Sequence, residues 1–146
     1  MNIQNKNIVI TGAANGIGYA LSKRMSEESP KSISLIDIKS SLKEVARSLN
    51  ADSYIVDVSN EHDFQTVLKD IINKYGSIDL FCSNAGIQQF GTLETSTLDW
   101  QKNWDVNVMS HIYAAKVLIP QMKKQGSGYL LLTVSAAGLL NMPGAI

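Results

Sequence analysis

The chain contains 146 residues, of which 45% are hydrophobic and 18% are charged, a composition typical of a globular domain and not of a disordered segment. Its thirteen basic residues balance thirteen acidic ones, and the lack of a basic tract argues against a nucleic-acid partner. No apolar run reaches the roughly 18 residues of a membrane span, and the N-terminus does not resemble a signal peptide. The single cysteine, Cys82, favours a reducing, cytoplasmic location.

Short β-rich runs alternate with longer helical stretches along the chain. We expect strands at residues 7–11, 33–37, 54–58, 78–82 and 129–134. We expect helices at residues 17–28, 41–49, 61–75 and 97–125. In the first helix, Ile17, Leu21 and Met25 share one face and are predicted to pack against the core. This alternation predicts a single α/β domain with a doubly wound, Rossmann-like parallel sheet and helices on both faces.

A glycine-rich turn, TGAANGIG, connects the first strand to the first helix. Gly12, Gly16 and Gly18 allow a tight turn and a close approach to a ligand, because glycine has no Cβ. The free N–H groups at the start of the helix suit a pyrophosphate. The spacing differs from the usual GxGxxG pattern, and no Walker lysine follows. The alternative is that these glycines only build a tight strand-to-helix turn.

An acidic residue, Asp37, ends the second strand at roughly the 20-residue interval at which an acid binds the ribose of a dinucleotide. Its carboxylate can accept hydrogen bonds from both ribose hydroxyls and repels the 2′-phosphate of NADP. Lys39 lies close enough to soften that repulsion, so NAD is favoured and NADP is not excluded. The alternative role for Asp37 is to cap the next helix.

Further motifs follow the glycine turn in a fixed order, and they lie at the ends of the third, fourth and fifth strands and within the long helical stretch. They are Asp57-Val58, Ser83-Asn84-Ala85-Gly86, Asn107 within the sequence WDVNV, and Ser135. Together with the glycine turn, this ordered set resembles the classical type of the short-chain dehydrogenase/reductase family over the whole chain. Ser83 departs from the family pattern, because it stands where the family has the first asparagine of an NNAG signature.

The resemblance implies an oxidoreductase that transfers hydride between NAD(P) and a small carbonyl or alcohol substrate, and it implies a homo-oligomer. It assigns catalytic roles to Ser135, which would bind the substrate oxygen, and to Asn107, which would hold a water in a proton relay. The residues it assigns to cofactor binding are Gly12, Asn15, Gly16, Ile17, Gly18, Asp37, Asp57, Val58, Asn84, Ala85 and Gly86.

The general acid of the family is a tyrosine in a Tyr-x-x-x-Lys pair that follows the catalytic serine. All five tyrosines precede Ser135, and the expected position falls just beyond Ile146. We therefore expect residues 1–146 to form a C-terminally incomplete NAD(P)-binding domain with little reductase activity of its own. The uncharged segment Gln125–Ile146 is expected to be core of a larger fold, and the fifth strand an unpaired apolar edge.

Two other functions remain open from the residues. One is a non-catalytic dinucleotide-binding or interaction protein of natural short length. The other is a different nucleotide-binding α/β protein, such as a methyltransferase that uses adenosylmethionine, although Asn84, Asn107 and Ser135 argue against it. His62 and His111 have no partner at metal-ligand spacing, and Cys82 is expected to be a buried, unreactive thiol.

Overall fold

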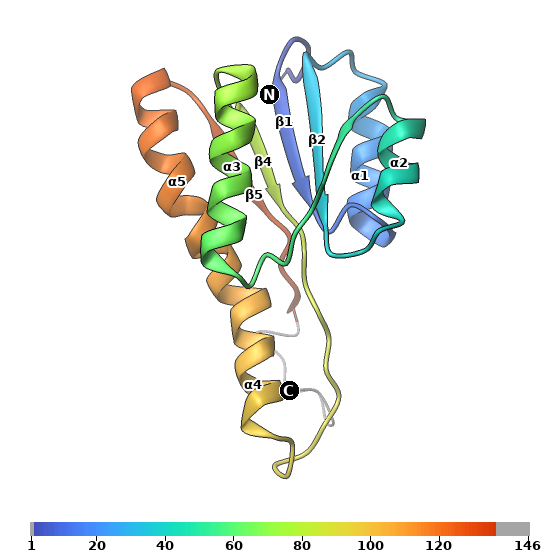
Figure 1. The fold of residues 1–146 in the computed structure, drawn as a ribbon, viewed down its shortest axis with the longest axis vertical. Helices are drawn as coiled ribbons and strands as arrows, with labels where there is room; N and C mark the ends of the chain where they lie inside the picture. The colour runs from blue at the N-terminus through green and yellow to red at the C-terminus, as the bar shows by residue number, and fades with distance from the viewer. Residues whose placement is uncertain (1, 137–146) are drawn as a thin grey trace.

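The computed structural model describes residues 2–136, which form one parallel sheet flanked by helices (Figure 1). The strands are β1 (Asn7–Thr11), β2 (Ser32–Asp37), β3 (Asp52–Ile55), β4 (Leu80–Ser83) and β5 (Tyr129–Leu132). Their order is β3-β2-β1-β4-β5, and each neighbouring pair is parallel. The predicted α/β doubly wound fold is confirmed. The order of the strands reverses between β1 and β4, which is where such sheets bind ligands.

The helices lie on both faces of the sheet, α1 and α2 on one side and α3 and α5 on the other (Figure 1). They are α1 (Gly16–Ser26), α2 (Leu42–Ser48), α3 (Glu61–Tyr75), α4 (Thr97–Trp104) and α5 (Ser110–Gln125). A π-helical turn, η1 (Asp105–Met109), joins α4 to α5. None of the helices in residues 2–136 is long and apolar enough to cross a bilayer.

Alternate residues of β1 supply the two cores. Ile8 and Ile10 pack with Leu35 and Leu42 under α1 and α2, whereas Val9 faces α3 and α5. The buried residues of α3 are Phe64, Leu68 and Ile71, which recur at the spacing of one helix face. Alternation along β1 thus buries both faces of the central strand, as parallel sheets require.

Only part of the predicted face of α1 packs against the core, because Met25 does so and Ile17 does not. Gly18 and Ser22 are buried, whereas Ile17 is 63% exposed. A Cβ on Gly18 would lie 2.1 Å from the carbonyl oxygen of Gly12, so the helix approaches the preceding turn too closely for a larger residue. Ser22 fits because its hydroxyl donates to the carbonyl of Gly18 at 2.7 Å. Close packing at Gly18 and Ser22 therefore buries part of α1 that the apolar pattern does not mark, next to the apolar contact of Met25.

Some predicted boundaries also shift. The third strand ends at Ile55 and not at residue 58, so Asp57 and Val58 lie in the loop before α3. The fifth strand ends at Leu132, and Ser135 follows it. Residues 137–146, part of the segment expected to be core, lie outside the described residues.

Candidate functional site

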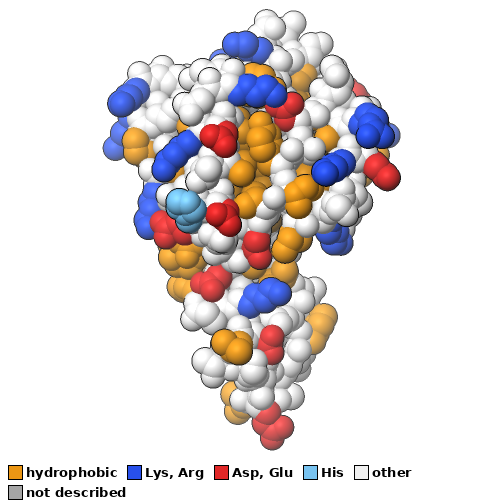
Figure 2. Space-filling model, in the orientation of Figure 1, with side chains coloured by type: hydrophobic (Ala, Val, Ile, Leu, Met, Phe, Trp, Pro, Cys, Tyr) orange, Lys and Arg blue, Asp and Glu red, His pale blue; other side chains and the backbone are white. Residues whose placement is uncertain are grey.

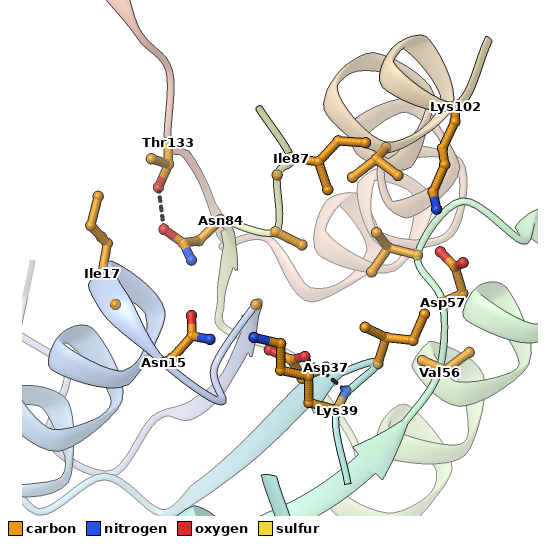
Figure 3. Close-up of a pocket in the computed structure, with 17 residues that line it drawn as sticks. Asn15, Ile17, Asp37, Lys39, Val56, Asp57, Asn84, Ile87, Lys102 and Thr133 are labelled. Carbon is orange, nitrogen blue, oxygen red and sulfur yellow. Dashed lines mark hydrogen bonds between the residues drawn. The ribbon is translucent and has the colours of Figure 1, made fainter. Parts of the chain in front are cut away.

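A cavity of about 620 Å³ lies at the carboxyl ends of the strands, where β1 and β4 are neighbours (Figure 3). This volume is in the range of small-molecule sites. The predicted binding residues that line it are Gly12, Asn15, Gly16, Ile17, Asp37, Asp57, Val58, Asn84, Ala85 and Gly86. The described lining does not include Gly18, Asn107 or Ser135. The fold therefore brings most of the predicted cofactor residues together and leaves the two predicted catalytic residues outside the lining.

The glycine turn forms one wall of the cavity by backbone geometry. Gly12 and Gly16 have φ angles of 68° and 55°, which non-glycine residues rarely adopt. A Cβ on Gly12 would lie 2.8 Å from the Cα of Ala85, whereas one on Gly16 would meet nothing within 4 Å. Gly12 thus allows contact with the opposite wall, and the backbone at Gly16 stays open to the cavity.

The first residues of α1, Gly16 and Ile17, line this cavity. Asn15 occupies the N-cap position, and its side chain makes no capping hydrogen bond in the described structure. Helix geometry leaves the first backbone N–H groups without intrahelical acceptors, and the positive end of the helix dipole adds to their attraction for an anion. Together with the open backbone at Gly16, this arrangement suits a phosphate or pyrophosphate.

Asp37 lies at the end of β2, on the rim of the cavity (Figure 3). One carboxylate oxygen accepts from the backbone N–H of Ala14, and the other accepts from that of Lys39, each at 2.9 Å. The N-cap of α2 is Ser41, so the alternative that Asp37 caps this helix is wrong. The carboxylate instead ties the glycine turn to β2, with Lys39 also lining the cavity.

The opposite wall is the segment after β4, which hydrogen bonds hold in place. The hydroxyl of Thr11 accepts from the backbone N–H groups of Asn84, at 2.9 Å, and Ala85, at 3.0 Å. The side-chain amide of Asn84 donates to the Thr11 carbonyl at 3.1 Å, and its oxygen accepts from the Thr133 hydroxyl at 2.9 Å (Figure 3). Asn84 thus connects the ends of β1, β4 and β5.

Asp57 and Val58 form the third side of the cavity. Asp57 accepts from the backbone N–H and the hydroxyl of Ser59, at 2.9 and 2.7 Å, which fixes the turn before α3. Val58 is buried in the core beneath. Lys102, from α4, extends toward Asp57 in Figure 3. Lys102 and Thr133 also line the cavity, although neither was among the residues predicted to bind the cofactor.

Asn107 lies in the π-helical turn and holds the segment after β4 from behind. Its side-chain oxygen accepts from the N–H of Ile87, and its amide donates to the Ile87 carbonyl, each at 2.9 Å. The amide also donates to the side-chain oxygen of Asn103 at 2.6 Å. Asn107 thus fixes the position of the segment after β4, which forms the cavity wall. Ser135 is exposed beyond β5, two residues after Thr133.

One Tyr-x-x-x-Lys pair does occur in the chain, at Tyr19 and Lys23. Both residues are exposed on α1. Tyr19 borders a shallow depression beside α2, where Glu44 and Ser48 lie, and not the main cavity. The pair precedes Ser135 in the chain, whereas the family's pair follows its serine, so it does not take the role of the expected acid.

Other titratable groups lie away from the cavity. Burial raises the pKa of the Cys82 thiol to about 12, which agrees with an unreactive buried cysteine. Burial also lowers the pKa of His111, against a backbone hydrogen bond to Asn107 that raises it. On the face that Figure 2 shows, basic and acidic side chains are interspersed, and no large area carries one sign of charge.

A family model described as short chain dehydrogenase matches residues 6–146. Among curated relatives, an uncharacterized oxidoreductase of Thermotoga maritima is 32% identical over 98% of this chain and 59% of its own length. The meso-2,3-butanediol dehydrogenase of Serratia marcescens is 33% identical over 95% of this chain and 57% of its own length. The chain thus spans somewhat under 60% of these two relatives.

Solved structures of dehydrogenases are also similar to this chain over about half of their own length. A short chain dehydrogenase/reductase from Burkholderia phymatum in complex with NAD has a TM-score of 0.92 and 30% identity, over 99% of this chain and 54% of its own. An NAD⁺-bound xylitol dehydrogenase has a TM-score of 0.89 and 27% identity, over 99% of this chain and 58% of its own.

Proposed function

The chain belongs to the short chain dehydrogenase family, and we propose that residues 1–146 form the dinucleotide-binding unit of an oxidoreductase that acts on a small carbonyl or alcohol. The observation that carries the proposal is the cavity at the β1–β4 switch point, which has an anion-binding helix start on one side and Asp37 on its rim. Both relatives solved with NAD support the same class of cofactor.

The residues present fit a nicotinamide dinucleotide. In this proposal the N–H groups at Gly16 and Ile17 bind the pyrophosphate, and Asp37 binds the adenosine ribose. Asp57 and Val58 border the adenine, and the backbone of Asn84, Ala85 and Gly86 packs against the cofactor. The open space at Gly16, which a Cβ would point into, supports a close approach of the ligand to the backbone.

The bound dinucleotide would supply or accept the hydride. The chain would orient the dinucleotide and the substrate and would provide polar groups to the substrate oxygen. We propose that Ser135 hydrogen-bonds the oxygen of the substrate and that Asn107 holds the wall against which the cofactor lies. We further propose a cytoplasmic homo-oligomer. The single reduced thiol supports the location, and the exposure of Leu98 and Trp104 on α4, at 81% and 55%, supports the assembly.

Cofactor identity is tested by calorimetric titration of the chain with NAD, NADP and adenosylmethionine. We expect NAD to bind most tightly and adenosylmethionine not to bind. In Asp37→Asn, which keeps the size of the side chain but removes its charge and one of the two hydrogen bonds that the carboxylate accepts, we expect the preference for NAD over NADP to fall about tenfold. Asp70→Asn, an exposed aspartate of α3, is the matched control and should leave the preference unchanged.

Absence of dinucleotide binding by the wild-type chain would contradict the proposal. A preference that does not respond to Asp37→Asn would remove Asp37 from the ribose site. A dinucleotide-binding protein without hydride transfer is the second candidate, and the position of Ser135 outside the described cavity lining favours it. Hydride transfer from an alcohol to NAD, or from NADH to a carbonyl, followed by the absorbance of the reduced nicotinamide, distinguishes the two candidates.

A further inference from the structure

The cavity wall Asn84–Ile87 is held at both of its ends by the helical segment that contains η1 and α5. At its far end, Ile87 exchanges two backbone hydrogen bonds with the side chain of Asn107, each at 2.9 Å. At its near end, the hydroxyl of Ser83 lies 2.5 Å from Nδ1 of His111. The two contacts, at Ser83 and Ile87, therefore lie on either side of Asn84, Ala85 and Gly86, which line the cavity.

Asn107 and His111 are four residues apart across the junction of η1 and α5, so their side chains project from the same side of the helical segment. Ser83 is 4% exposed, and His111 is partly buried. A buried hydroxyl that loses its partner costs stability, because water cannot replace the hydrogen bond. The Ser83–His111 hydrogen bond thus joins β4 to α5, and its loss should cost stability.

The chemistry of the two groups is complementary. Burial lowers the pKa of His111, which favours the neutral imidazole near neutral pH. The neutral ring and the Ser83 hydroxyl can share this hydrogen bond with either as the donor, because the tautomer of the imidazole sets the role of Nδ1. Serine is shorter than the asparagine that the related motif carries at this position, and the imidazole from α5 supplies the polar atom that meets its hydroxyl.

We propose that His111 is a positioning residue of the dinucleotide site, which acts through Ser83 to hold the wall Asn84–Ile87 in its binding geometry. The inference rests on the proposed function, since it concerns the affinity of that same site. Neither Ser83 nor His111 lines the cavity, so their effect on a ligand is transmitted by the wall. The wall then has two anchors on one helical segment, and release of either should weaken binding.

The test is a double-mutant cycle on NAD affinity, measured by calorimetry at a temperature at which circular dichroism shows every variant to be folded. We expect Ser83→Ala and His111→Leu each to weaken NAD binding about fivefold. We expect the double variant to be no weaker than the worse single variant, because one contact is lost in all three. His111→Asn, whose amide lies near the place of Nδ1, should restore most of the affinity.

The second histidine supplies the matched control. His62 is exposed on α3, and His62→Leu should leave NAD affinity unchanged. Unchanged affinity in both Ser83→Ala and His111→Leu would overturn the inference, as would additive losses in the double variant or failure of His111→Asn to restore binding. If the wild-type chain itself does not bind NAD, the proposed function fails together with the inference; if it binds and the variants do not differ, the inference alone fails.

Discussion

The two walls of the cavity are built by different means. The wall formed by the glycine turn depends on backbone conformation, with φ angles at Gly12 and Gly16 that other residues rarely adopt and contacts too short for a Cβ at Gly18. The wall after β4 depends on side chains, because Asn84 and Asn107 hold it through hydrogen bonds. We therefore expect a large loss of stability and of NAD binding when an atom is added to the first wall. We expect a smaller loss of NAD affinity when hydrogen bonds are removed from the second wall.

The largest effect is expected at the first wall. In Gly18→Ala, the new Cβ meets the carbonyl of Gly12, so the turn must move, and overpacking of this kind costs about 3 kcal/mol. We expect the free energy of unfolding, measured in urea, to fall by about that amount, and NAD binding to be lost. The control is Gly76→Ala at the end of α3, where φ is 84° and the space is open.

Gly76→Ala should cost only the strain of a positive φ, about 1 kcal/mol, and leave NAD affinity unchanged. Equal losses in the two glycine variants would show that backbone strain, and not the close contact at Gly18, limits the first wall.

A smaller effect is expected at the second wall. Asn84→Ala removes the hydrogen bond to the carbonyl of Thr11 and the one from Thr133. We expect NAD affinity to fall about tenfold while the chain stays folded, since each hydrogen bond contributes about 1 kcal/mol. Asn60→Ala, which removes the N-cap of α3 away from the cavity, should lower stability and spare affinity. If Asn84→Ala abolishes folding, the expectation of a limited loss of NAD affinity at this wall is wrong.

The smallest effect is expected away from both walls, at the edge strand β3. Burial raises the pKa of Asp52, but hydrogen bonds from Lys74, at 2.6 Å, and Tyr75, at 2.5 Å, outweigh it and hold the pKa below its usual value. A carboxyl whose pKa is lower in the folded state stabilises the fold above its unfolded pKa, and the contribution is lost as the pH falls through the folded value.

Asp52→Asn should therefore lower stability at pH 7 by about 0.5 kcal/mol, because the cluster is largely solvated. The stability of the variant should also fall less than that of the wild type between about pH 5 and about pH 3. Urea unfolding at a series of pH values measures both, with Asp70→Asn as the reference. A change in NAD affinity in Asp52→Asn would mean that the walls are not independent of this edge.

The elements themselves were largely predictable, because hydrophobic periodicity is local. The strand at Asn7–Thr11 and the helix at Glu61–Tyr75 have the predicted bounds. Ile17 was wrongly predicted to be buried, since an apolar pattern cannot show that the helix approaches its own preceding turn at Gly18. The short contact that decides the packing of α1 appears only in three dimensions.

The parts of the candidate site that short motifs form through their backbone were predictable. Side-chain contacts between residues far apart in the chain were not. The turn around Gly12 and the acid Asp37 meet as expected at one edge of the sheet. His111 was read as an isolated histidine, because Ser83 lies on another element and only the fold brings the two together. The one available signal was the serine itself, which departs from the asparagine of the related motif.

The burial of Cys82 has a practical consequence. This thiol lies in β4, is 1% exposed, and is opposite Ile10 of β1 on one side and Leu131 of β5 on the other. A reagent reaches it only when the sheet opens, so its labelling rate measures the population of open molecules. Because the chain has a single cysteine, each labelled molecule gains one adduct. A ligand that binds at the ends of the same strands stabilises the closed sheet and should slow the labelling. The labelling rate of Cys82 therefore reports how much of the cavity is occupied.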